Sequence, residues 1–206
     1  MESYTTILER ASFEYEDRKS VFIGDAMPVE SENDALKFIN AIKKKYPDAS
    51  HHVYAYVLRD NSIMRFSDDR EPQGTAGMPV LEAIRKSGVD DACIVVTRYF
   101  GGILLGAGGL VRAYSHSAVI AINEAEIVVY EPYNEYSLSC GYSEYQKYSN
   151  ILSLEGVIID STDFGAEVLV RFAVKKTQAE RVLTRINEAG YGRDIPQLCG
   201  ERFDCR

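Results

Sequence analysis

The sequence predicts an α+β protein built from two domains, and three observations support this. The chain has 206 residues, which is long for one domain and sufficient for two that each bury a core. Short stretches with apolar residues at every second position alternate with stretches whose apolar residues recur at helical spacing. After Glu131-Pro132 a strand–helix–strand pattern begins and repeats once, so we expect domains at 1–132 and 133–206.

The composition is typical of a globular protein. Hydrophobic residues make up 46% and charged residues 26% of the chain, and the net charge is −8. This balance argues against a broad phosphate-neutralising surface, although a local basic patch is compatible with it. No signal-peptide pattern or membrane-length apolar run is present, so we expect a cytoplasmic protein that does not bind a membrane. Four cysteines without a C-x-x-C pair and only three histidines favour neither disulfides nor zinc, and we predict no cofactor.

The first elements are strands followed by a helix. Short β-rich pieces between Ser3 and Pro28 predict a hairpin or meander. Ser31 is the expected N-cap of the helix, with Asp34 three residues later as in a capping box. Tyr46-Pro47 ends the helix, because a residue before proline avoids helical geometry. The apolar stripe expected to cover a sheet face consists of Ala35, Phe38, Ile39 and Ile42.

An acidic turn follows the next two strands. His52–Leu58 alternates as a strand, with Met64–Ser67 as its expected hairpin partner. Thr75 is expected to cap a helix that starts near Met78-Pro79. The carboxylates between them suit a hard divalent cation or a general base; alternatively, they form a solvated turn beside a helix N-terminus. These carboxylates belong to Asp68, Asp69 and Glu71.

The central stretch, from Cys93 to Ser117, is predicted as strand, glycine loop and helix, with the helical apolar pattern beginning at Leu110. Glycines can turn their N–H groups toward one point, where the following helix adds its positive dipole end. The loop therefore predicts an anion site flanked by Arg98 and Arg112. Alternatively, the glycines only let the helix pack closely against its strand. The five glycines are Gly101, Gly102, Gly106, Gly108 and Gly109.

Familiar catalytic and phosphate-binding patterns do not fit this stretch. The spacing G-x-G-x-x-G counted from Gly106 requires glycine where Val111 stands. The P-loop spacing counted from Gly101 requires lysine where Ala107 stands. Ser115–Ser117 contains a Ser/His pair, but adjacent residues on a helix diverge and cannot share a proton. The loop is therefore neither a dinucleotide fingerprint nor a P-loop, and we reject a hydrolase triad.

The remaining chain predicts a strand at Ile127–Tyr130 and then a ferredoxin-like βαββαβ domain. Residues 134–206 carry 9 basic and 11 acidic residues, so this domain offers no obvious basic platform. It also lacks the aromatic strand signature of an RNA-recognition motif. Its expected strands are Tyr136–Tyr142, Gly156–Asp160, Ala166–Val174 and a weaker one between Ile195 and Phe203, and its helices are Glu144–Leu154 and Thr177–Ala189.

Two segments, DDREPQGTAGMP at 68–79 and TRYFGGILLGAGGLVRAY at 97–114, resemble the signatures of the YigZ/IMPACT family. The segments ASH at 49–51 and YAY at 54–56 fit the same resemblance, which covers nearly the whole chain. Two departures are visible: the family commonly has glycine where Arg70 stands, and its glycine loop can carry lysine where Leu104 stands.

The resemblance implies an N-terminal domain with the left-handed βαβ type of fold seen in a small-subunit ribosomal protein, elongation factor G and the GHMP kinases. It also implies a C-terminal domain similar to the ferredoxin-like domains of elongation factor G. In eukaryotic relatives the family regulates translation by opposing the activation of an initiation-factor kinase. Fold kinship by itself assigns no function.

Three functional hypotheses follow. The first is a translation-associated regulator that binds RNA or the ribosome, with the glycine loop, Arg98 and Arg112 accepting phosphate. The second is an enzyme acting on a small phosphorylated or nucleotide substrate, with the acidic turn and the glycine loop in one cleft. The third treats both motifs as structural devices. The candidate catalytic residues of the second hypothesis are Asp68, Asp69, Glu71 and His51, the first three also being candidate metal ligands.

Overall fold

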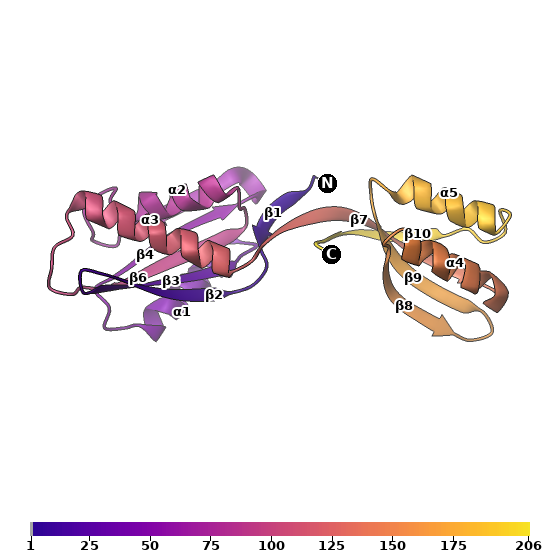
Figure 1. Cartoon of the computed structure of the whole chain (residues 1–206), viewed down its shortest axis with the longest axis horizontal. Helices are drawn as coiled ribbons and strands as arrows, with labels where there is room; N and C mark the ends of the chain where they lie inside the picture. Colours follow the sequence, from indigo (N-terminus) through magenta and orange to yellow (C-terminus); the bar gives the residue numbers. More distant parts are fainter. Residues whose placement is uncertain (1) are drawn as a thin grey trace. The chain divides into compact units, whose positions relative to one another are not determined.

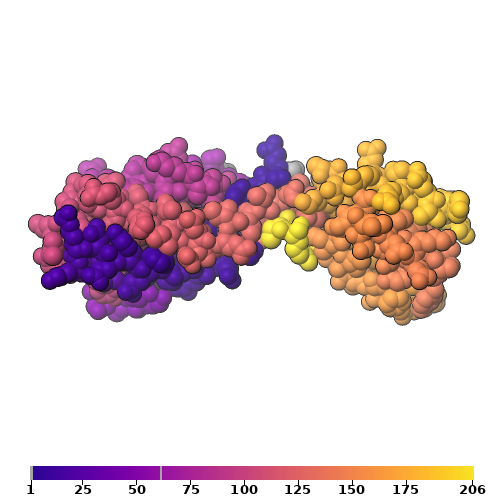
Figure 2. Space-filling view, viewed as in Figure 1, coloured from indigo at the N-terminus to yellow at the C-terminus, as the bar shows by residue number. Residues whose placement is uncertain are grey.

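The computed structural model describes residues 2–206, apart from the side chain of Asn61. Its contacts divide the chain into a first unit, Tyr4–Val129, and a second unit made mainly of Tyr130–Arg206. Each unit is compact, and both can be followed by their colours in the space-filling view (Figure 2). Within the described residues no helix has the length and hydropathy that a membrane span requires.

The first unit contains a five-stranded sheet in the order β2-β3-β6-β4-β5. All four neighbouring pairs are antiparallel, and β6 lies in the centre (Figure 1). Seven of the eight residues of β6 are buried, as a strand covered on both faces requires. The strands are β2 (Ala11–Asp17), β3 (Ser20–Pro28), β4 (His51–Leu58), β5 (Ile63–Ser67) and β6 (Ala92–Tyr99).

Helices cover both faces of this sheet. Helix α1 (Glu32–Lys45) lies on one face, and α2 (Gly77–Ser87) and α3 (Ala107–Glu124) lie together on the other (Figure 1). The predicted cap of α1 is confirmed: the Ser31 side chain accepts a hydrogen bond from the Asp34 N–H. The predicted stripe of α1 is also confirmed, since Ala35, Phe38, Ile39 and Ile42 are all buried.

The second unit has the predicted βαββαβ order. Its helices α4 (Tyr142–Leu154) and α5 (Ala179–Ala189) share one core with the sheet, which contains Leu138, Tyr148 and Phe172. Strand β7 pairs with β9 and β10, and β9 pairs with β8, all antiparallel, while β1 (Tyr4–Ile7) is a further neighbour of β7. The strands are β7 (Ile127–Cys140), β8 (Ile158–Phe164), β9 (Val168–Lys175) and β10 (Gln197–Asp204).

Several predicted element boundaries are wrong. The strands expected at Ile127–Tyr130 and Tyr136–Tyr142 belong to the single strand β7, which ends at Cys140. It is continuous because Pro132 pairs with Phe203 and its carbonyl accepts the Lys176 N–H. Proline lacks only the donor and keeps its acceptor, so it does not interrupt this strand. Helix α3 begins at Ala107 rather than near Leu110, since its first glycines are helical without contributing to an apolar pattern.

Candidate functional site

The first carboxylate of the acidic turn caps a helix. Asp68 accepts hydrogen bonds from the amides of Gly74 (2.9 Å), Ala76 (3.1 Å) and Gly77 (2.7 Å), where α2 begins. A carboxylate at this end also complements the helix dipole. The prediction that Thr75 caps this helix is therefore wrong, since its hydroxyl donates to the Pro72 carbonyl instead. Asp68 therefore accepts the free amides at the start of α2, although it lies well before that helix in the sequence.

Replacing Asp68 with alanine is expected to lower the free energy of unfolding by about 1–2 kcal/mol, because buried amides lose their acceptor. Asp68→Asn keeps one oxygen acceptor and is expected to lose less. Urea unfolding followed by circular dichroism measures both. A loss for Asp68→Ala within the about 0.5 kcal/mol typical of surface substitutions would contradict the capping role.

The second carboxylate joins the acidic turn to the start of β4. Asp69 accepts the His52 amide through its side chain (2.6 Å) and the His51 ring through its carbonyl oxygen (2.9 Å). A carbonyl only accepts, so Nδ1 of His51 carries a proton. Nε2 of the same ring lies 3.7 Å from Glu71 Oε1. The acidic turn is thus fixed to β4 by two successive histidines.

The backbone of this turn explains one departure from the family signature. Arg70 has φ +72°, in the left-handed region that favours glycine. Its side chain is largely exposed and reaches the Ser50 carbonyl at 3.3 Å. The glycine that the family signature commonly has here therefore meets a conformational requirement, which this chain meets with an arginine.

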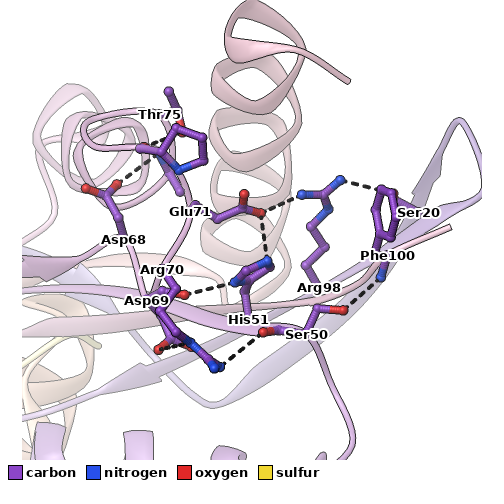
Figure 3. Close-up of polar contacts among 12 residues, drawn as sticks. Ser20, Ser50, His51, Asp68, Asp69, Arg70, Glu71, Thr75, Arg98 and Phe100 are labelled. Carbon is purple, nitrogen blue, oxygen red and sulfur yellow. Dashed lines mark hydrogen bonds and ion pairs between the residues drawn. The ribbon is translucent and has the colours of Figure 1, made fainter. Parts of the chain in front are cut away.

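The third carboxylate lies at the centre of a buried polar network (Figure 3). Glu71 Oε1 accepts hydrogen bonds from Arg98 Nη1 (2.6 Å) and from the Tyr114 hydroxyl (2.8 Å). Arg98 is the penultimate residue of β6 and Tyr114 belongs to α3, so Glu71 connects the two elements on either side of the glycine loop. Burial and the Glu71 carboxylate raise the pKa of Tyr114, which keeps its phenol protonated as a donor. The acidic turn and the elements that flank the glycine loop are therefore joined.

Arg98 is enclosed rather than presented to solvent. It is 4% exposed, and its guanidinium lies between the rings of Phe22 (5.4 Å) and Phe100 (5.5 Å). The sheet register produces this arrangement, since Phe22 and His51 are the two residues paired with Arg98 across β3 and β4. Arg98 holds neighbouring elements together, and its guanidinium is already paired with the Glu71 carboxylate.

The start of the glycine loop is pressed against a hairpin turn. The Ser20 hydroxyl accepts the Gly101 amide at 3.2 Å and lies 3.3 Å from Arg98 Nη2. A Cβ on Gly101 would lie 2.0 Å from the carbonyl carbon of Lys19, so only glycine fits. A Cβ on Gly109 would meet Leu105 Cβ at 2.9 Å. Both glycines are therefore required by close packing, although their neighbours are the β2–β3 turn and Leu105 of the loop and not the strand β6 that the close-packing interpretation named.

Gly108 has no such requirement. A Cβ there would meet nothing closer than Arg112 Nη1 at 3.7 Å, and its φ lies outside the left-handed region. Gly106, the N-cap of α3, makes no side-chain cap, so the first amides of the helix lack one. Arg112 is exposed and, among residues 2–206, no hydrogen bond or ion pair is found for it. The guanidinium of Arg112 thus lies over a bare, uncapped helix N-terminus.

The structure does not gather the three acids around one point. Among the described residues no group of three His, Cys, Asp or Glu side chains is placed to hold a metal ion. The three acids instead hold the turn, the sheet and α2 in place.

Cys93 is buried in β6, where burial raises the pKa of its thiol. An open hollow of about 260 Å³ lies between the C-terminal ends of α2 and α3, and no predicted site residue lines it.

Sequence reasoning missed four participants in this network. Tyr114 lies in the signature segment 97–114, but nothing in the sequence indicates that its hydroxyl contacts Glu71. Ser20 and Ser50 carry no local signal, although Ser50 precedes His51 in a segment of the family signature. Phe100, which also lies in a signature segment, covers Arg98. The signature segments contain three of these four positions, and only Ser20 lies outside them.

Comparisons with known proteins agree with the sequence signatures. The family model described as the Impact N-terminal domain matches residues 18–122, and the domain of unknown function DUF1949 matches residues 138–193. An IMPACT family member of Haemophilus influenzae is 34% identical over 201 residues, covering 96% of this chain and 98% of that protein. The IMPACT family member YigZ of Escherichia coli is 35% identical over 93% of this chain and 96% of that protein.

Two further relatives extend the comparison. The IMPACT family member YvyE of Bacillus subtilis is 46% identical over 129 residues, which cover 62% of this chain and 59% of that protein. A crystal structure described only as that of a hypothetical protein is 32% identical, with a TM-score of 0.62 over 97% of this chain and 98% of that one. The two matched domains and the full-length relatives show that this chain belongs to the IMPACT family.

Proposed function

We propose that this protein is a translation-associated regulator whose N-terminal domain binds the phosphates of RNA at the start of α3. The observation that carries the proposal is the bare turn at Gly108, with the Arg112 guanidinium above it and no side-chain cap on the helix. Backbone amides, a helix dipole and an arginine are the groups that proteins use to bind phosphate. Glycine at position 108 lets an anion approach the backbone closely.

The family resemblance supplies the translational part of the proposal. It implies a regulatory role in translation among eukaryotic relatives and a domain fold like those of a ribosomal protein and elongation factor G. Fold likeness alone does not assign a function, so the proposal rests on the site and uses the resemblance to choose RNA or the ribosome as partner. In this proposal Gly101, Gly102, Gly106, Gly108 and Gly109 form the loop and helix start, Arg112 contacts phosphate, and Arg98 fixes the loop.

The acidic net charge of the protein limits the electrostatic contribution to RNA binding. A net charge of −8 gives long-range repulsion of nucleic acid, so binding depends on a few local contacts. We therefore expect a shallow salt dependence, with a slope that corresponds to one or two phosphates at about 0.7 per contact on a single strand.

Arg112→Glu is expected to weaken RNA binding at least about ten-fold, because a charge-assisted contact becomes repulsive. Lys44→Glu on the exposed side of α1 is the matched control, since it changes the net charge equally on the opposite sheet face. We expect it to change affinity by less than about two-fold at physiological salt, where distant surface charges are screened. Fluorescence anisotropy at several salt concentrations measures both affinity and slope.

Equal RNA affinity for wild type and Arg112→Glu would remove the proposal. Inorganic phosphate and a nucleoside monophosphate serve as additional probes in a thermal-shift assay, because a ligand that binds only the folded state raises the melting temperature. Stabilisation by these small probes without RNA binding would instead support a small phosphorylated ligand, the second hypothesis.

A further inference from the structure

Phe100 is an exposed aromatic residue held in a fixed position at the entrance to the glycine loop. Its side chain is 47% exposed although it follows the buried strand β6. Its amide donates to the Ser50 hydroxyl at 3.2 Å, and the ring lies over the Arg98 guanidinium (Figure 3). Backbone and ring are thus both fixed, while about half of the side-chain surface remains in water.

The surroundings of Phe100 prevent the ring from folding inward. Below it, the space is filled by Arg98, which is buried, paired with Glu71 and stacked on Phe22. After it, Gly101 is held against the backbone of Lys19. An apolar ring that is kept exposed by a rigid frame has a defined surface ready for a ligand, with little conformational entropy to lose on binding.

The loop that follows Phe100 exposes two further apolar side chains before α3 begins. Ile103 is 41% exposed and Leu104 is 81% exposed, and Gly106 follows two residues later as the N-cap of α3. One short segment therefore contains an exposed aromatic ring, two exposed aliphatic side chains and a helix start without a side-chain cap. An unpaired nucleotide offers the matching groups, a planar base and a phosphate, whereas a duplex keeps its bases stacked inside.

We propose that Phe100 stacks on an unpaired base of the RNA whose phosphate lies at the start of α3, so that the protein selects single-stranded over duplex RNA. This inference rests on the proposed function. It identifies the RNA as single-stranded and assigns Phe100 the role of selecting it. The cation beneath the ring and the bare helix end beyond it are the two observations that carry the inference.

The charge distribution gives base stacking an energetic role. On the sheet face opposite α4 and α5, Arg202 is paired with Glu135 (3.0 Å) and Asp160 (2.8 Å), and Arg171 with Asp163 (2.8 Å). These arginines are already neutralised and provide no broad phosphate-binding face. At the glycine loop, stacking on an aromatic ring is a contact that does not depend on charge and adds to the few phosphate contacts.

The experiment compares an unpaired RNA, a duplex of the same sequence and the unpaired RNA with abasic positions, by fluorescence anisotropy. Wild type is expected to bind the unpaired RNA at least about five-fold more tightly than either competitor, from the loss of one stacked base. Phe100→Leu is expected to remove this preference, and Phe100→Tyr to retain it. Phe164→Leu, at a 61% exposed ring in the second unit, is the control and is expected to leave the preference unchanged.

The outcomes separate the two proposals. If Arg112→Glu weakens binding to every RNA but Phe100→Leu leaves the single-strand preference intact, phosphate binding stands and base stacking is overturned. If wild type binds the unpaired RNA and the same RNA with abasic positions with equal affinity, base stacking is overturned. This outcome does not depend on how stably Phe100→Leu folds. If neither Arg112→Glu nor Phe100→Leu changes binding, both proposals fall.

Discussion

Replacing Glu71 with alanine is expected to lower the free energy of unfolding by about 3–5 kcal/mol. The substitution leaves the Arg98 guanidinium buried without its carboxylate, and it removes the acceptor of the buried Tyr114 hydroxyl. Each change leaves a polar group unsatisfied in a region where water cannot replace the partner. Since small domains are stable by only about 5–15 kcal/mol, this loss is a large part of the total.

Two controls distinguish this buried pair from an ordinary salt bridge. Asp163→Ala breaks the exposed pair with Arg171, whose side chains are 54% and 62% exposed, and is expected to cost less than about 1 kcal/mol. The double variant Glu71→Leu with Arg98→Met removes both charges and is expected to recover most of the loss, because the penalty comes from the unpaired charge. Urea unfolding monitored by circular dichroism measures all three. A double variant as unstable as Glu71→Ala would refute this explanation.

The second large effect is expected at Gly101. Gly101→Ala places a methyl group 2.0 Å from the carbonyl carbon and oxygen of Lys19, so the loop or the hairpin turn has to move. Because the obstructing atoms are backbone, we expect a loss of about 3 kcal/mol, at the upper end of overpacking effects. The shift also displaces Phe100, so RNA selectivity is expected to fall with stability.

Gly108→Ala is the matched substitution with the opposite expected sign. Its methyl group enters open space in a helical turn, so the free energy of unfolding is expected to rise by up to about 1 kcal/mol. RNA affinity is expected to fall, since the methyl group stands where the anion approaches the backbone. Thermal melting and anisotropy on the same samples test both. A Gly108→Ala variant with unchanged affinity would indicate that this glycine has no binding role.

The acidic turn shows why local sequence misassigned a cap. Thr75 stands where an N-cap residue is expected, and it is a good capping residue by type. The helix is instead capped by Asp68, six to nine residues before the amides that it accepts. Capping rules consider neighbours within one helical turn, and they do not detect a carboxylate that a turn brings back from a distance.

The sequence by itself determined the α+β class, the order of the strands and helices and their buried faces, because these depend on periodicity among residues a few positions apart. It also identified the acidic turn and the glycine loop as a connected pair through the family signatures. It did not determine which residues of the acidic turn and the glycine loop contact which others. Arg98 pairs with Glu71, 27 positions away, and Gly101 lies against Lys19.

Only the tertiary structure decided those contacts, because sheet register brings Phe22 and His51 to either side of Arg98. Register depends on pairing along whole strands, and no short window of sequence contains that information. In the fold Arg98 forms a buried ion pair, whereas Arg112 is exposed at the helix start. The sequence alone predicts both arginines as equivalent flanks of one anion site.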